Sequence, residues 1–445
     1  MKILQLFFMF IFLGVQSQSG FQLQNSTKTT IPFQLINNLI FIPVNINGAE
    51  LTFLLDSGVA ETILFSLDNK QVNFNNVEKI KFSGLGENMD IEGLQSINNS
   101  VSVGKDFVDK SHTIFIILDE GINFSSHVGI PVNGIIGYHF FRNHPVQIDF
   151  IKKKITIYNT STDFEKKKKR FEEFPISIEK KKPYLEAEVE MTTEKKPSKL
   201  LLDLGNSDAI WLFPSLIKNF VYNRPNIDDF LGRGFNGDIF GKRSRIHSFS
   251  IGKFNFEKPL AAMPDEYSIQ HLTLVKDRKG SIGNDILRRF LVIFDYPNQK
   301  IYFRKNKHFS DPFLFNKSGL DIKHDGMMWE KDLVKVETQK KNANDIEVYN
   351  HKNTDSFQYK FVLKPQYSVA GCRKNSPCEK AGLLKDDKII SIKGKKAGDL
   401  TLDGINRILK DHDGTFVEFE IERNGQNMKL GLYLEDPIPY QENQN

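Results

Sequence analysis

Short runs of alternating hydrophobic and polar residues recur along the first two thirds of the chain. The clearest run, Ile40–Gly58, has two apolar stretches on either side of Asn47-Gly48, a pair that is typical of the tight turn in a β-hairpin. The glycine-rich segments Phe82–Gly93 and Phe230–Gly241 predict two more hairpins, because glycine permits the backbone angles of tight turns. Phenylalanine is unusually common, with 38 residues, and aromatic residues favour strands. The pattern predicts a mainly β fold.

The same unit occurs twice within the first 305 residues. Asp56 and Asp203 each follow an apolar run, and each is followed two positions later by glycine. The glycine-rich segments and the closing segments, Asn133–Tyr158 and Gly280–Phe303, repeat in the same order at offsets of 146 to 148 positions. Ordered blocks at nearly one offset indicate a duplication. We therefore predict two similar lobes, at residues 20–158 and 183–305, with a complete core by Lys305.

The two repeated aspartates carry the candidate chemistry. Burial of an ionised carboxylate costs several kcal/mol or more unless the group is hydrogen-bonded or shifts its pKa. Because Asp56 and Asp203 lie in the same local context, we predict that they act together. Two carboxyl groups that are held close cannot both ionise, so one keeps a proton. Such a pair can activate a water with one group and protonate a carbonyl oxygen with the other.

At these residues the sequence resembles the aspartic proteases of the pepsin and retropepsin type. Asp56-Ser57-Gly58 is followed downstream by Ile135-Ile136-Gly137, and Asp203-Leu204-Gly205 by Ser281-Ile282-Gly283. The resemblance covers Phe33–Lys305. It implies two fused β-barrel lobes and an endopeptidase in which Asp56 and Asp203 are the catalytic residues.

The resemblance also implies roles for the neighbouring residues. It assigns support of the active-site loops to Ser57, Gly58, Leu204 and Gly205, and the two flaps to Gly84, Leu85, Gly86, Gly232 and Gly234. The chain departs from the family at Leu204, where members carry Thr or Ser, and the first flap lacks the usual tyrosine. These departures leave a catalytically inactive peptide-binding protein of the same fold as an alternative. The resemblance implies no cofactor, and two cysteines and ten histidines without ligand spacing predict no metal site.

The C-terminal part, Lys374–Leu434, resembles a PDZ domain of the type found with bacterial proteases. The order Ser376-Pro377, Ala381-Gly382-Leu383 and an amphipathic helix at 402–410 carries the resemblance. It implies an α+β domain at residues 318–436, with an insertion at 327–357, that binds a substrate or the C-terminal peptide of a partner. The residues that it assigns to peptide binding are Gly319, Leu320 and Ile322. A secreted adaptor, in which this domain carries the function, is a second alternative.

The remaining segments bear on location and partners. Lys2 and the apolar run Ile3–Val15 predict a signal peptide at residues 1–19, since the run is shorter than the roughly 20 residues that span a membrane. We expect export to the periplasm or the cell exterior, without a transmembrane anchor. A net charge of +5 is small for 445 residues and argues against nucleic acid as a partner.

Three segments are predicted to lie between or after the domains. They are a charged linker between the lobes at 159–182, a second linker at 306–317 and a tail at 437–445. Export permits a disulfide between Cys372 and Cys378, but the spacing alone leaves open whether it forms.

Overall fold

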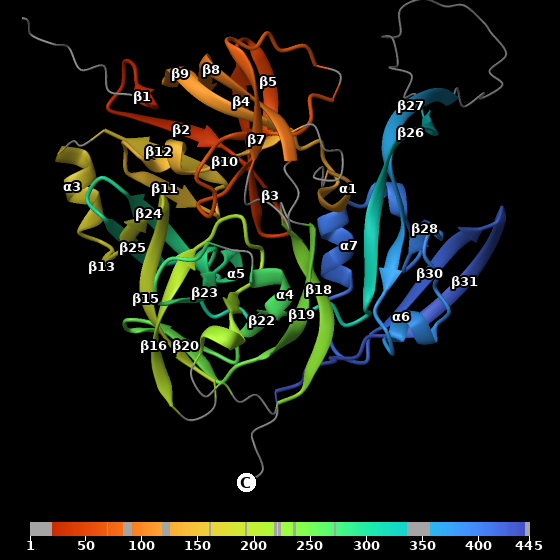
Figure 1. Ribbon diagram of the computed structural model, residues 1–445. Helices are drawn as coiled ribbons and strands as arrows, with labels where there is room; N and C mark the ends of the chain where they lie inside the picture. The colour runs from red at the N-terminus through yellow and green to blue at the C-terminus, as the bar shows by residue number, and fades with distance from the viewer. Residues whose placement is uncertain are drawn as a thin grey trace, which may run out of the picture.

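The structure is a computed structural model in which strands predominate (Figure 1). The predicted signal peptide and the first-flap residues Gly84, Leu85 and Gly86 lie outside the described residues. Within the described part, the strands form four sheets, so the mainly β prediction is confirmed. The described residues are 20–68, 70–82, 91–117, 125–159, 162–191, 194–217, 220, 224–234, 237–270, 273–335 and 357–440.

The first lobe is built on a nine-stranded sheet. β4 (Leu39–Ile46) and β5 (Ala49–Leu55) form the predicted hairpin, and Asn47 and Gly48 both have positive φ at its turn. β5 also runs parallel to β10 (Gly134–Ile136), so β5 is central. The other strands of this sheet are β1 (Gln22–Leu23), β3 (Gln34–Ile36), β6 (Ile63–Leu64), β7 (Val77–Phe82), β8 (Ile91–Val103) and β9 (Phe107–Ile117).

The second lobe repeats this arrangement on a ten-stranded sheet. β15 (Lys182–Glu190) and β16 (Lys195–Leu202) pair as a hairpin, and β16 runs parallel to β23 (Arg278–Ile282). This matches the order of β4, β5 and β10. The remaining strands are β14 (Ser177–Glu179), β17 (Ile210–Leu212), β18 (Asn226–Gly234), β19 (Gly237–Arg245), β20 (Ser248–Ile251), β21 (Phe254–Glu257) and β22 (Leu260–Pro264).

A six-stranded antiparallel sheet joins the two lobes. In it Gln147 lies opposite Ile293, and these residues are 146 positions apart, which is the offset of the repeated closing segments. Pairing between equivalent residues places a pseudo-twofold axis between them. The strands are β2 (Lys28–Pro32), β11 (Val146–Asp149), β12 (Lys154–Tyr158), β13 (Glu172–Pro175), β24 (Phe290–Asp295) and β25 (Lys300–Lys305).

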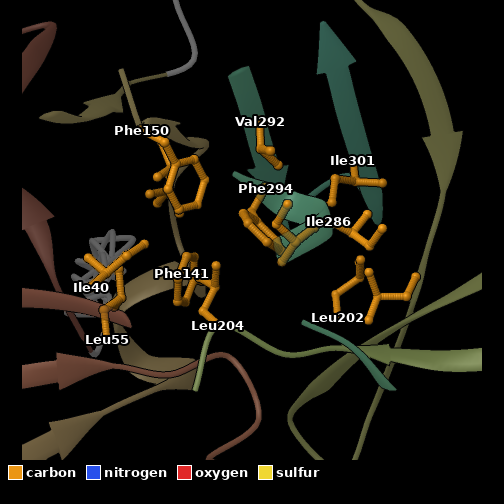
Figure 2. Packing of buried hydrophobic residues seen from close by; sticks show 14 of the residues in the cluster. Ile40, Leu55, Phe141, Phe150, Leu202, Leu204, Ile286, Val292, Phe294 and Ile301 are labelled. Carbon is orange, nitrogen blue, oxygen red and sulfur yellow. The ribbon is translucent and has the colours of Figure 1, made fainter. Parts of the chain in front are cut away.

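One apolar core extends across this axis. Ile40 and Leu55 of the first lobe belong to the same buried cluster as Leu202 and Leu204 of the second. Figure 2 shows Phe141, from the short helix α2 (Tyr138–Phe141), between these two groups of side chains. Burial of such side chains contributes most of the free energy of folding, so the two lobes are stabilised as one unit.

The segments predicted as linkers pack into this unit. In residues 159–182, the helix α3 (Thr162–Lys168) buries Phe164 completely, and β13 pairs with β25. In residues 306–317, Phe313 and Phe315 are at most 9% exposed and belong to the lobe core. Ile438, from the predicted tail, is fully buried in the same core. The described residues of these segments are therefore parts of the two-lobed body.

The C-terminal domain has a separate core under a six-stranded sheet. Ile405 and Leu409, in and just after helix α7 (Leu402–Ile408), are fully buried there, and Cys372 and Cys378 form a disulfide. The strands are β26 (Leu320–Lys335), β27 (Phe357–Cys372), β28 (Lys388–Ile392), β29 (Lys395–Lys396), β30 (Phe416–Arg423) and β31 (Gln426–Tyr433). The predicted insertion thus begins and ends as paired strand, and its residues 336–356 lie outside the described part.

Candidate active site

Asp56 and Asp203 occupy equivalent positions at the ends of the central strands β5 and β16. The backbone N–H of Asp56 donates to the carbonyl of Ile136 at 3.0 Å, and that of Asp203 donates to the carbonyl of Ile282 at 2.9 Å. Each carboxylate also accepts a hydrogen bond from the glycine two residues later, at 2.7 Å for Asp56 and 3.1 Å for Asp203. The parallel strands β10 and β23 therefore fix the two loops in the same way.

The two loops bring the carboxyl groups face to face. A Cβ atom on Gly58 would lie 3.0 Å from Asp56 Oδ1 and 2.9 Å from Asp203 Oδ1, and a Cβ atom on Gly205 would overlap the Asp56 carboxylate. The two side chains hydrogen-bond to each other and keep partial contact with solvent. The close approach requires glycine at both positions.

Ser57 joins the two loops across the lobe boundary. Its fully buried Oγ donates to the carbonyl of Leu202 at 2.7 Å and accepts from the backbone N–H of Leu204 at 3.0 Å. At the equivalent place in the second lobe, the Leu204 side chain packs into the shared apolar core (Figure 2). The loops are therefore tied by one serine, and an apolar contact replaces the second tie.

The electrostatic environment favours one shared proton. Burial, together with the nearby charge of Asp203, raises the pKa of Asp56 to about 7. Burial also raises the pKa of Asp203, but Arg278, Lys182 and a backbone N–H act in the opposite direction. The pair therefore holds a proton at mildly acidic pH, and the cations favour the negative charge on Asp203.

The sequence alone indicates neither of these two cations as part of the site. Lys182 falls in the predicted linker as part of a lysine run, and Arg278 precedes the repeated turn without belonging to a motif. In the structure both act on the charge of Asp203, and the side chain of Arg278 hydrogen-bonds to Tyr184. The repeat offset of 146 to 148 positions does not pair Lys182 with Leu39, so only the strand register places Lys182 opposite Asp203.

The second predicted flap is a hairpin of β18 and β19. Gly232 lies in it with a φ of +151° and open space where a side chain would be, next to a shift in the strand register. Gly234 ends β18. In the first lobe, β7 and β8 form the corresponding hairpin, whose predicted tip is outside the described residues. The role of both hairpins as flaps stays a prediction.

Of the predicted peptide-binding residues, Leu320 and Ile322 lie at the start of the edge strand β26, and Gly319 directly precedes it. Their geometry differs from a free carboxylate-binding loop. The N–H of Gly319 donates to Asn316 Oδ1 at 3.3 Å, and that of Leu320 donates to Ser318 Oγ at 3.0 Å. The side chains of Leu320 and Ile322 are buried in the domain core. A peptide carboxylate would have to displace these internal partners.

The first lobe also contacts this edge of the C-terminal domain. Helix α1 (Ser125–Val128) packs against β26, and a Cβ atom on Gly129 would lie 3.5 Å from Leu402 of α7 and 3.8 Å from His324. Figure 1 shows α1 beside the start of α7. Next to this contact, a cavity of about 1020 Å³ lies between the second lobe and the domain, lined by Gly319, Leu320, Asn406 and Lys410 among others. Access to the β26 edge therefore depends on the lobes.

Within the described residues, no group of three or more His, Cys, Asp or Glu side chains is arranged to hold a metal ion. In the same part of the chain, no helix has the length and apolar character needed to cross a membrane.

Residues 336–434 match the family model of the PDZ domain. Among solved structures, the aspartic proteinase from Irpex lacteus is similar to this chain, with 11% sequence identity and a TM-score of 0.41, over 64% of this chain and 99% of that one. Similarity at this level does not by itself define a shared fold. None of the curated proteins compared with the chain matches it. The C-terminal part of this mainly β protein therefore contains a PDZ domain.

Proposed function

We propose that this protein is an aspartic endopeptidase that hydrolyses peptide bonds with a water activated between Asp56 and Asp203. The observation that carries the proposal is the symmetric placement of two half-buried carboxyl groups that hydrogen-bond to each other. A structural role alone would not require two repeated loops to place like charges together, because their repulsion destabilises the fold.

The chemistry follows from the shared proton. The Asp203 carboxylate accepts a proton from the bound water as the water oxygen attacks the carbonyl carbon, and Asp56 gives its proton to the carbonyl oxygen. The resulting tetrahedral diol collapses when Asp203 gives its proton to the leaving nitrogen, Asp56 takes a proton from one diol hydroxyl and the C–N bond breaks, which restores the shared proton of the pair. One water is consumed, and two peptide fragments leave without a covalent enzyme intermediate.

The other parts of the chain support a role in proteolysis outside the cytoplasm. The N-terminal pattern of Lys2 and Ile3–Val15 supports export. The PDZ domain supports binding of a substrate or of a partner's C-terminal peptide, and its contact with helix α1 would link that binding to the catalytic lobes. A tethered binding site raises the local concentration of a bound substrate.

A peptide library tests this function. The full-length protein should cleave members of the library at mildly acidic pH, and a statine-type peptide should protect the library. A protein that binds the statine peptide but cleaves nothing would instead be the inactive peptide-binding protein. Leu204 favours this alternative, because members of the resembled family carry a hydroxyl residue at that position. A protein that neither binds nor cleaves would leave the PDZ domain as the functional part.

A further inference from the structure

The two lobes differ in charge beside the pair of carboxyl groups of Asp56 and Asp203, here called the dyad. They differ although their strands repeat. The register of β15 against β16, continued by two residues, brings Lys182 opposite Asp203. The register of β4 against β5, continued in the same way, brings Leu39 opposite Asp56. One carboxyl group thus faces a leucine across the hairpin, and the other faces a lysine.

A second cation strengthens the difference. Arg278 begins β23, and the equivalent residue 146 positions earlier is Val132. The guanidinium of Arg278 lies 5.1 Å from the ring centroid of Phe213 and hydrogen-bonds to the side chain of Tyr184. Val132 instead is fully buried in an apolar cluster of the first lobe. This cluster consists of Phe41, Leu54, Ile63, Phe65, Ile117, Val128, Val132 and Ile135. The first lobe is therefore apolar where the second lobe is cationic.

Lys182 is a half-buried cation without a direct partner. Within the described chain, its ammonium group makes no hydrogen bond and no ion pair, whereas the preceding Lys181 pairs with Glu61 at 2.5 Å. Burial lowers the pKa of Lys182, and the charges that act on it are those of Arg278, of Asp56 and Asp203, and of Lys180. A cation held in such a place is stabilised when an anion joins it.

The charges of the site do not balance without a substrate. When the dyad shares one proton it carries a single negative charge, and this charge faces both Lys182 and Arg278. The surroundings are partly desolvated, so a further carboxylate would interact with Lys182 more strongly than it would in water. An apolar side chain at the same place would keep the ammonium group from water and would offer it no acceptor.

We propose that Lys182, together with the nearby charge of Arg278, selects a peptide carboxylate next to the scissile bond. The residue that it selects is an aspartate or glutamate whose side chain lies against the second lobe. This inference rests on the proposed peptidase function, and it makes Lys182 a specificity-determining residue.

Pairs of statine-type peptides test the proposal. Within each pair the residue on one side of the statine is glutamate or glutamine, and both sides are tried in turn. Calorimetry at pH 6 gives the Kd for the full-length protein. At one of the two positions, the glutamate peptide should bind about tenfold more tightly than the glutamine peptide, as one charge-assisted contact predicts. Lys182→Leu, which introduces the residue found in the first lobe, should abolish this preference.

Matched variants separate charge from damage to the fold. Lys181→Leu, which removes the neighbouring and more exposed lysine, should keep the preference. Lys182→Gln, which retains a polar side chain, should lose it just as Lys182→Leu does.

The outcomes are distinguishable. Equal affinity for glutamate and glutamine at both positions, or a preference that survives both substitutions of Lys182, would overturn this inference and leave the proposed function in place. A wild-type protein that binds none of the statine peptides would overturn both.

Discussion

The hydroxyl of Ser57 is predicted to hold the two halves of the candidate active site together. It makes two hydrogen bonds across the lobe boundary, to the carbonyl of Leu202 and from the N–H of Leu204, in a position that solvent does not reach. The substitution Ser57→Ala deletes both bonds and adds no bulk. It leaves the carbonyl of Leu202 and the N–H of Leu204 buried without these hydrogen bonds next to the dyad.

The cost can be worked from these two groups. A buried polar group that loses its partner costs about 1–3 kcal/mol, so the loss of two partners in Ser57→Ala should lower the free energy of unfolding by about 2–6 kcal/mol. This is a large part of the ~5–15 kcal/mol by which proteins are stable. The urea dependence rises with chain length, so it lies near the upper end of the ~1–3 kcal/mol per molar of small proteins, and the unfolding midpoint should fall by about 1–2 M. Urea unfolding followed by intrinsic fluorescence measures it.

Leu204→Thr is the matched control at the equivalent position. By the pseudo-twofold axis, the introduced hydroxyl faces the carbonyl of Leu55 and the backbone N–H of Ser57, so it can restore the missing tie. We expect unchanged or higher stability and unchanged or higher activity. An unchanged midpoint in Ser57→Ala would refute the reasoning about the tie. A strong loss of stability in Leu204→Thr would show that the second loop does not follow the geometry of the first.

Three further predictions concern pH, the domain boundary and the glycine loops. Because folded Asp56 holds its proton up to about pH 7 while an unfolded aspartate titrates near 3.8, stability should fall as pH rises from about 4 to 7. Asp56→Asn should therefore resist urea better than the wild type at pH 8 but not at pH 4. A chain that ends at Lys305 loses the buried phenylalanines of 306–317, and the loss of each such side chain lowers the free energy of unfolding by about 3–5 kcal/mol. Thermal scans should therefore show this chain unfolded. A chain that keeps residues 306–317 should be more stable. Gly205→Ala should abolish peptide cleavage because its Cβ would overlap the Asp56 carboxylate, whereas Gly371→Ala, which meets open space, should cleave at the wild-type rate.

The features of the fold that follow from local chemistry could be predicted from the sequence. Asn47-Gly48 marks its hairpin because both residues adopt positive φ there. The repeat predicted that Asp56 and Asp203 come from equivalent loops, and the structure brings their carboxyl groups into contact. The prediction of the pair depended on the duplication, since each aspartate alone stands in a short and common motif.

The features that depend on tertiary contacts could not be predicted. Residues 306–317 read as a linker, yet the fully buried Arg289 donates to backbone carbonyls of this segment, including that of Pro312 at 3.4 Å. Lys182 read as part of a charged run, and only the strand register reveals that it faces the dyad. The backbone donors near Gly319 looked free in sequence, but side chains of the same loop occupy them.

The most direct test of the catalytic pair is a comparison of peptide cleavage rates among single-site variants at mildly acidic pH. Asp56→Asn and Asp203→Asn should each lower kcat by at least about a thousandfold with the fold intact by circular dichroism, because the two groups act as one unit. Asp149→Asn, at a repeated aspartate that accepts backbone N–H bonds in a turn, should cleave at the wild-type rate. Cleavage by Asp56→Asn or Asp203→Asn at a rate close to that of Asp149→Asn would contradict the account.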